Sequence, residues 1–171
     1  SMVFQDVYLF DDSLIANIRV GRPDASDEEI FRAANLSGVT SIANRLGWHT
    51  PVGEGGRLLS GGERQRVSVA RALLKQAPIV LFDEATSALD AENEANILAA
   101  MDELREQSTF IVIAHKLDTI KSADQIVVLD EHGQVSQLGT HSELSDVPGI
   151  YRHFWQQRKA ARGWKISSGR D

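Results

Sequence analysis

Three features that would point to other classes of protein are missing from this sequence. It contains no cysteine, so no disulfide framework exists, which fits a reducing compartment. No stretch approaches the roughly eighteen unbroken apolar residues that a membrane-spanning helix needs. Net positive charge is also missing: the chain carries −6, which argues against nucleic acid as its main partner, because phosphate binding needs a basic surface.

What is present fits one soluble globular domain. The chain has 171 residues, of which 42% are hydrophobic and 25% charged, and this is enough to bury a real core. Basic residues gather near the end of the chain, and we interpret them as a solvated tail rather than a lipid-contacting patch. They are Arg158, Lys159, Arg162, Lys165 and Arg170.

The first third of the chain has a helical pattern. Ser26 followed by Glu29 forms a capping box, which predicts the start of a helix. Apolar residues with helical spacing predict a second helix over residues 39–46, and residues 47–56 are rich in glycine and predict a loop. No strand is predicted between residues 12 and 58, so this stretch is expected to form a small helical subdomain.

Beyond residue 60, helices and strands alternate. A helix is predicted over residues 61–76, and the continuous apolar runs at 79–82 and 110–113 predict strands buried on both faces. Residues 126–129 and 135–138 predict a hairpin. This alternation predicts a three-layer α/β core with a largely parallel sheet. Further expected elements are a strand ending at residues 3–5, a helix capped by Asp90, a capping box of Thr140 and Glu143, and a last helix carrying Tyr151, Phe154 and Trp155.

The start of the helix at 61–76 has a composition that stability alone does not explain. Ser60 and Glu63 form a capping box, but Gly61 and Gly62 stand in the first turn, where each glycine costs about 1 kcal/mol in helix propensity. Glycines at a helix start leave backbone N–H groups open to an anion, and the helix dipole favours negative charge there. The pattern therefore indicates an anion site.

Polar residues also follow the two predicted buried strands. Asp83 and Glu84 end the first strand at the carboxyl edge of the sheet, which is the usual ligand side of such folds. An unpaired buried charge is costly, so we interpret this pair as functional rather than as two acids that merely flank a turn. His115 follows the second strand, and taken alone such a histidine is as often structural as catalytic.

These runs, in this order, resemble the motifs of the ABC ATPases. Residues 59–66 (LSGGERQR) resemble the signature motif, and residues 79–84 resemble the strand that carries the metal-side carboxylates. The phosphate-cradling loop G-x-x-x-x-G-K-[S/T] is absent from the sequence, so we expect a P-loop NTPase core truncated at its N-terminus. The resemblance divides the chain into residues 1–11 (glutamine loop), 12–62 (helical signature subdomain) and 63–171 (RecA-like core).

The resemblance implies roles for the residues on either side of a bound nucleotide. The signature residues of one domain would contact ATP held by its partner; they are Ser60, Gly61, Gly62 and Glu63. Asp83 would hold Mg²⁺ through water, and Glu84 would polarise the attacking water. His115 resembles the switch histidine that contacts the γ-phosphate.

Further residues match weaker motifs of the family. Gln5 resembles the glutamine that reaches both the metal and the attacking water. Ser87 and Asp90 resemble the loop at the dimer interface, although Asp90 is also simply a good N-cap. Residues 50–56 resemble the segment that touches coupling helices in exporter-type members. The missing loop implies that this chain alone binds and hydrolyses ATP poorly.

The resemblance implies the ATPase domain of an exporter-type ABC transporter, which uses ATP and Mg²⁺. Its partners would be a second nucleotide-binding domain, identical or not, and a transmembrane domain at the cytoplasmic face of the membrane. Because the strand of the phosphate loop would lie beside residues 110–114, its absence predicts an open strand edge and strand-swapped self-association. Two alternatives remain: a soluble ABC ATPase acting on nucleic acid or ribosomes, and a non-catalytic interaction module.

Overall fold

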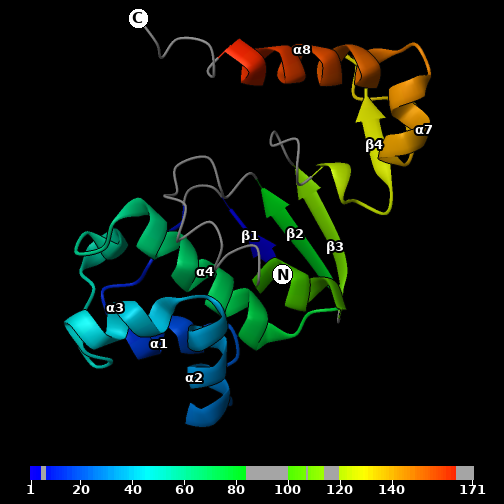
Figure 1. Ribbon diagram of the computed structural model, residues 1–171. Helices are drawn as coiled ribbons and strands as arrows, with labels where there is room; N and C mark the ends of the chain where they lie inside the picture. Colours follow the sequence, from blue (N-terminus) through cyan, green and yellow to red (C-terminus); the bar gives the residue numbers. More distant parts are fainter. Residues whose placement is uncertain (5–6, 84–99, 107, 114–119, 165–171) are drawn as a thin grey trace, which may run out of the picture. The chain divides into compact units, whose positions relative to one another are not determined.

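The computed structural model describes residues 1–4, 7–83, 100–106, 108–113 and 120–164, with side chains described as far as residue 160 (Figure 1). The chain forms two compact units, Ser1–Ile113 and Ala114–Asp171. The domain boundaries expected from the sequence stay a prediction.

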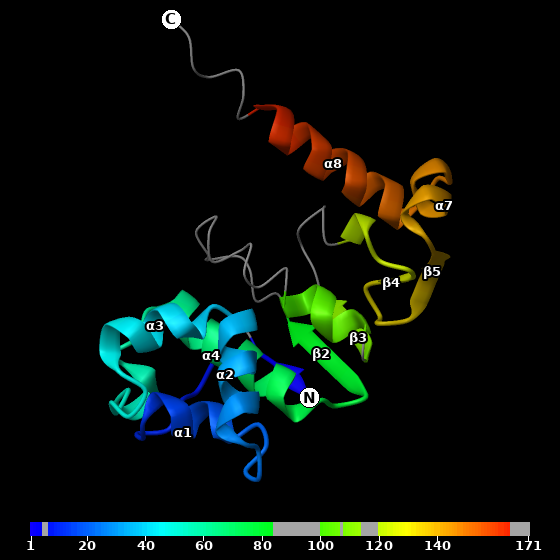
Figure 2. The ribbon, with the colours of Figure 1, turned by 60° about the horizontal axis from the view of Figure 1, so that its bottom comes forward.

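The first unit contains a three-stranded parallel sheet. Its strands are β1 (Met2–Val3), β2 (Ile79–Asp83) and β3 (Thr109–Ile113), in the order β1-β2-β3 (Figure 2). Val3 lies opposite Phe82, and Phe82 lies opposite Val112. The structure thus confirms the mixed α/β class, the parallel sheet and both predicted apolar strands.

One face of this sheet is covered by helices. The helix α4 (Gly61–Lys75) and the helical residues 100–106 pack against Val80 and Phe82, which are buried. Because residues 76–78 form only a short connection, α4 runs antiparallel to β2, and Figure 1 shows that it starts beside the helical elements and ends close to the beginning of β2. The core on this side consists of Val3, Val69, Ala72, Val80, Phe82, Ala100, Met101 and Leu104.

Among the described residues of this unit, no element covers the other face of the sheet, which corrects the prediction that both apolar strands are buried on both faces. The exposed fractions are 53% for Ile79, 38% for Leu81, 49% for Ile111 and 58% for Ile113. The apolar composition of these strands favours burial of both faces. Within the described residues of this unit, however, α4 and the helical residues 100–106 pack on one face only. A helical layer on the second face therefore stays a prediction. β3 pairs only with β2 among the described strands, and self-association through its outer edge also stays a prediction.

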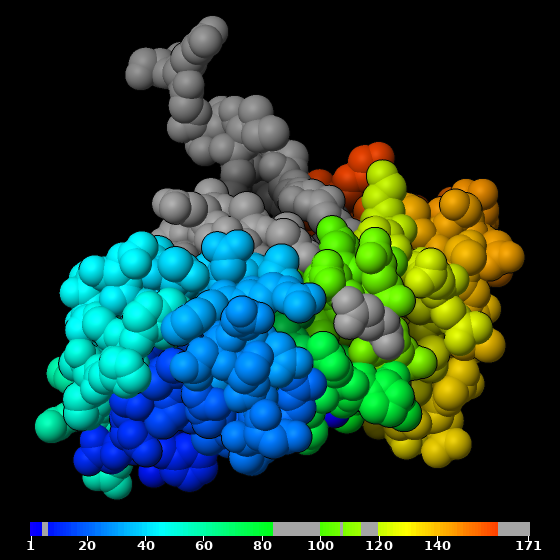
Figure 3. All heavy atoms as spheres, turned by 90° about the horizontal axis from the view of Figure 1, so that it is seen from below, coloured from blue at the N-terminus to red at the C-terminus, as the bar shows by residue number. Residues whose placement is uncertain are grey.

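A helical cluster packs against α4. It comprises α1 (Leu14–Arg19), α2 (Asp27–Leu36), α3 (Val39–Leu46) and the short 3₁₀ helix η1 (Glu54–Gly56), whose elements form the blue-to-cyan surface in Figure 3. The predicted helix at 39–46 is confirmed. Val67, Ala70 and Leu74 of α4 belong to this core, whereas Val69 and Ala72 of the same helix belong to the core under the sheet. One helix therefore joins the two halves of the unit.

The second unit combines a hairpin with two helices. β4 (Ile126–Leu129) and β5 (Val135–Gly139) are antiparallel, as predicted, and the turn is held by Asp130, whose Oδ1 accepts the N–H groups of His132 and Gln134 at 2.9 Å each. The helices α7 (His141–Asp146) and α8 (Ile150–Trp164) follow. No helix in the described part of the chain has both the length and the apolar character needed to cross a membrane.

Among the described helices, three begin with a capping box, in which the cap hydroxyl accepts a backbone N–H and a glutamate accepts the N–H of the cap residue. The pairs are Ser26 with Glu29, Ser60 with Glu63, and Thr140 with Glu143. Hydrogen bonds from the cap backbone hold the pKa values of Glu29 and Glu143 below the usual 4.5. Burial alone would raise the pKa of Glu63, but bonds from Ser60 and Arg45 outweigh this and lower it.

These pKa shifts predict a loss of stability in acid. A carboxylate whose pKa is lower in the folded state stabilises the fold above its unfolded value of 4.5, and this stabilisation disappears as the pH falls through the folded pKa. The free energy of unfolding, measured with urea, should therefore decrease steeply below about pH 4.5. A triple variant, E29Q/E63Q/E143Q, should lose less between neutral and acid pH than the wild type. An equal loss in both proteins would show that other carboxylates dominate.

Candidate functional site

The start of α4 is a helix cap closed by two reciprocal hydrogen bonds. Ser60 has extended backbone angles (φ −64°, ψ 164°), and its Oγ accepts the N–H of Glu63 at 3.2 Å. The carboxylate of Glu63 accepts the N–H of Ser60 at 2.8 Å in return. Both predicted cap residues are therefore engaged with each other, as the sequence indicated.

The two glycines between them leave donors open. The N–H groups of Gly61 and Gly62 precede the first intrahelical bonds, and among the described residues no acceptor is paired with them. Neither glycine has a positive φ, and a Cβ added at Gly61 would meet nothing closer than Arg64 Nη2 at 3.9 Å. The fold thus requires glycine at position 61 neither for its backbone angles nor for space, and what glycine provides is access to the backbone.

Arg45 of α3 holds Glu63 from the side. Its Nη2 lies 2.5 Å from Glu63 Oε1, and the exposed fractions of the two side chains are 53% for Arg45 and 14% for Glu63. The other carboxylate oxygen of Glu63 is the one that bonds the Ser60 N–H. The negative charge of Glu63 is therefore turned toward α3 and the helix cap, and the cation beside it partly neutralises it.

Asp83 is the last residue of β2 and the register partner of Ile113 in β3. Its side chain is partly exposed, and no hydrogen-bond donor among the described residues is paired with its carboxylate. An unengaged carboxylate at the carboxyl edge of a parallel sheet suits a hard cation such as Mg²⁺, which binds oxygen ligands. The remaining predicted site residues lie outside the described residues, and they are Gln5, Glu84, Ser87, Asp90 and His115.

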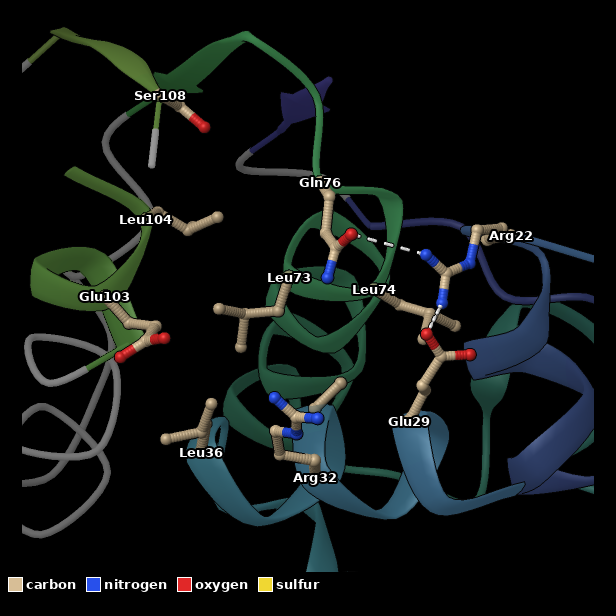
Figure 4. Close-up of a pocket in the computed structure, with 11 residues that line it drawn as sticks. Arg22, Glu29, Arg32, Leu36, Leu73, Leu74, Gln76, Glu103, Leu104 and Ser108 are labelled. Atoms are coloured by element: carbon tan, nitrogen blue, oxygen red, sulfur yellow. Dashed lines mark hydrogen bonds and ion pairs between the residues drawn. The ribbon is translucent and has the colours of Figure 1, made fainter. Parts of the chain in front are cut away.

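A small cavity lies elsewhere in the first unit, between α2, the end of α4 and the helical residues 100–106 (Figure 4). Its volume is about 60 Å³, far below the several hundred Å³ of a typical ligand pocket. Arg22 lies on its wall, where it pairs with Glu29 and donates to Gln76 Oε1 at 3.3 Å. None of the predicted site residues lines it, so this cavity is not the site that the motifs indicate.

Sequence reasoning missed a polar connection behind the site. Asn17 of α1 is fully buried, and Arg71 of α4 donates to its backbone oxygen and to its Oδ1, both at 2.7 Å. The two residues are 54 positions apart in the chain. No local pattern marks such a pair, because a single arginine in an amphipathic helix reads as a solvent-facing residue.

The comparisons with known proteins agree with the arrangement of the motifs. A family model described as the RecF/RecN/SMC N terminal domain, a P-loop ATPase domain, matches residues 9–137. The ATP-dependent lipid A-core flippase of Neisseria meningitidis is 48% identical over 153 residues, which are 88% of this chain and 24% of the flippase. The β-(1→2)glucan export ATP-binding/permease protein NdvA of Agrobacterium vitis is 50% identical over 151 residues, 87% of this chain and 26% of that protein.

A third relative and a solved structure extend this result. The mycobactin import ATP-binding/permease protein IrtB of Mycolicibacterium thermoresistibile is 46% identical over 170 residues, 98% of this chain and 29% of that protein. The structure of a bacterial Atm1-family ABC exporter with ATP bound matches with a TM-score of 0.85 and 44% identity, over 92% of this chain and 28% of the exporter. The chain therefore belongs to the family of P-loop ATPase domains that this model describes, and its relatives show that it is an ATP-binding domain of the ABC transporter type. It spans about a quarter of the length of these relatives.

The contact between Arg45 and Glu63 generates a prediction about the cap. Replacing Arg45 by leucine should raise the pKa of Glu63 toward its usual value, because the favourable charge is lost. Stability near neutral pH should fall by about 1 kcal/mol or less, since Arg45 is exposed and screened by solvent. The acid loss of stability should begin at a higher pH than in the wild type, as measured by urea unfolding across pH.

Arg32→Leu is the matched control for this experiment. Arg32 is exposed on the neighbouring helix α2, and no ion pair involves it among the described residues. Its replacement should leave the acid transition where it is in the wild type. The same shift in both variants would mean that only net charge, and not the contact with Glu63, sets the transition.

Proposed function

We propose that this chain supplies the signature helix and the catalytic carboxylates of an ATP-hydrolysing domain, which drives an exporter-type transporter in a head-to-tail pair of domains. The observation that carries this proposal is the start of α4, where a capping box leaves the backbone donors of Gly61 and Gly62 unpaired at the surface. The intact protein is proposed to be the active ATPase, because the sequence given contains no phosphate-cradling loop.

The donors at the start of α4 suit the γ-phosphate of ATP. The N–H groups of Gly61 and Gly62 are open, and the Ser60 hydroxyl accepts from Glu63 and still has its own proton to donate. The helix dipole places about half a positive charge at this end. Three donors and a favourable field in one turn form the kind of anion site that phosphates occupy.

A shared site explains why these donors face outward. Ser60 and Gly61 are exposed on the surface of the first unit, so a nucleotide held here needs a second surface. We propose that this surface is the phosphate loop of a partner domain, identical or different. Ser87 and Asp90 would lie at the interface between the two domains.

The catalytic steps are assigned by their match to the family motifs. Asp83, through water, and Gln5 would hold Mg²⁺, which neutralises charge on the β- and γ-phosphates when bound. Glu84 orients and polarises the attacking water, and His115 contacts the γ-phosphate. Phosphoryl transfer depends mainly on positioned charge and an oriented nucleophile, so adjacent carboxylates with different tasks suffice.

The partner of the pair of domains is proposed to be a transmembrane domain, which would place this chain at the cytoplasmic face of a membrane. The names of the three relatives refer to lipid A-core, to glucan export and to mycobactin import, so their cargoes and directions of transport differ. This chain is nevertheless 46–50% identical to each of them over the matched segment. We therefore assign no cargo. A soluble ATPase acting on nucleic acid or ribosomes is not favoured, since these relatives are transporters.

Replacing Ser60 by aspartate in the full-length protein separates the anion role from the capping role. Aspartate caps a helix about as well as serine, so the unfolding midpoint should stay close to that of the wild type. ATP-dependent pairing of the domains and ATP hydrolysis should fall at least about tenfold, because a carboxylate would stand against the γ-phosphate and a like charge within a few ångströms costs more than 1 kcal/mol.

Ser60→Asn is the matched control, since asparagine is an equally good cap without the charge. It should retain clearly more hydrolysis and pairing than S60D, measured by phosphate release and by size-exclusion chromatography with ATP. If S60D and S60N behaved alike at equal stability, the start of α4 would be a cap and nothing more.

Glu84→Gln in the full-length protein should leave ATP binding intact and slow hydrolysis by about 10²-fold or more, because an amide cannot accept the proton of the attacking water. Binding can be measured with radiolabelled ATP and hydrolysis by phosphate release. Glu131→Gln, at an exposed glutamate in the hairpin turn, is the control and should hydrolyse ATP like the wild type. Unchanged turnover in E84Q would remove Glu84 from the role of base.

A further inference from the structure

Arg64 places its guanidinium beside the first turn of α4. Its Nη1 donates to the backbone oxygen of Leu59, the residue before Ser60, at 2.8 Å. Its Nη2 lies 3.9 Å from the position that a Cβ at Gly61 would occupy. The side chain therefore turns back toward the N-terminal end of its own helix, where the open N–H groups of Gly61 and Gly62 lie.

Two neighbouring residues of α4 bind one peptide group from its two sides. The carbonyl of Leu59 and the N–H of Ser60 belong to the same planar peptide unit. The carbonyl accepts from Arg64 Nη1 at 2.8 Å, and the N–H donates to Glu63 Oε2 at 2.8 Å. The bond to this peptide unit orients the guanidinium of Arg64 toward the helix cap.

The aliphatic stem of Arg64 also has a defined path, because it packs on Gly56. This glycine has a left-handed φ of 71°, and a Cβ there would lie 3.0 Å from Arg64 Cδ and 2.8 Å from Leu9 Cδ1. Position 56 therefore requires glycine for its backbone angle and for the space that the stem of Arg64 occupies. The direction of the side chain is thus set by packing as well as by its hydrogen bond to Leu59.

The positive charge of Arg64 is not offset at the cap. Arg45 and Glu63 form an ion pair, so the two charges largely cancel each other. Among the described residues no carboxylate pairs with Arg64, whose side chain is partly exposed. Glycine at position 61 keeps the guanidinium accessible, since a Cβ there would be in van der Waals contact with Arg64 Nη2. The charge that remains beside the first turn is therefore that of Arg64.

We propose that Arg64 supplies positive charge to the phosphate site at the start of α4 and thereby strengthens the hold of this site on the terminal phosphate of ATP. This inference rests on the proposed function and adds a residue to the site. A guanidinium stays protonated in proteins, so its attraction for a phosphate does not depend on pH. The attraction acts over several ångströms, so it requires no direct bond to the phosphate.

The test is a charge series at Arg64 in the full-length protein, in which R64K keeps the charge and R64Q and R64M remove it. The ATP concentration for half-maximal hydrolysis should rise about tenfold in R64Q and R64M, and less than about threefold in R64K. Two unit charges roughly 10 Å apart interact with about this strength where the effective dielectric constant is about 20. Inhibition by ADP should change less than about twofold in every variant, because ADP has no terminal phosphate for Arg64 to attract.

Salt separates an effect of charge from an effect of packing. Sodium chloride screens the attraction between Arg64 and the phosphate, so the ATP concentration for half-maximal hydrolysis should rise with salt in the wild type. The rise should be less steep in R64Q and R64M, which have no charge to screen at this position. If Arg64 only held the peptide unit between Leu59 and Ser60, the salt dependence of every variant would run parallel to that of the wild type.

Arg32→Gln is the matched control, because it removes one positive charge from α2 of the same unit, where Arg32 is exposed and forms no ion pair with the described residues. It should keep the half-saturation and the salt dependence of the wild type. Equal shifts in R32Q and R64Q would attribute the effect to the net charge of the domain and overturn the proposal. If R64M does not fold, R64Q takes its place. Failure of both neutral variants to fold would make Arg64 a structural requirement and would also overturn the proposal.

The remaining outcomes separate this inference from the proposed function. A wild-type protein that hydrolyses no ATP overturns both together. A wild type that hydrolyses ATP, combined with an R64Q variant whose half-saturation or salt dependence equals that of the wild type, overturns this inference alone. A rise in half-saturation that R64Q and R64M share and R64K largely avoids, together with a shallower salt dependence, supports it, because a loss of packing alone would not follow the charge.

Discussion

α4 must bury two sides and still present its first turn to solvent. Val67, Ala70 and Leu74 pack into the helical cluster, whereas Val69 and Ala72 pack under the sheet. With both sides held, the direction of the helix is fixed, and so is the direction in which its first N–H groups point. The anion site therefore needs few residues of its own, because the packing of the rest of the helix orients it.

Local signals in the sequence predicted local structure well. The capping boxes at Ser26, Ser60 and Thr140 are each contained within four residues, and all three are confirmed. The parallel sheet also followed, since apolar runs of strand length alternating with helices have few other arrangements. The packing on the second face of the sheet could not be predicted. The apolar residues at 79, 81, 111 and 113 indicate a preference for burial, but they do not indicate which segment would bury them.

For the candidate site, too, the sequence predicted local contacts but not long-range ones. The donors at the start of α4 could be predicted because glycine, cap and helix are neighbours in the chain. Two long-range contacts of the same helix could not be predicted: Glu63 pairs with Arg45, 18 positions away, and Arg71 bonds Asn17, 54 positions away. Arginine and asparagine have no periodicity that marks a long-range partner. The roles of Gln5, Glu84 and His115 rest on their match to the family motifs and stay predictions.

The position of Glu63 poses an electrostatic problem that the structure solves. A carboxylate three residues into the helix caps it well, but at this helix it also stands beside the proposed position of a phosphate, where a second negative charge is unfavourable. The structure keeps the cap and reduces the charge: one carboxylate oxygen is turned back to the Ser60 N–H, and the other is paired with Arg45. Within the cap, the unpaired N–H groups of Gly61 and Gly62 therefore dominate the electrostatic potential at the first turn. An arginine from α3 thus makes a stabilising cap compatible with anion binding, and this ties the helical cluster to the chemistry of the signature helix.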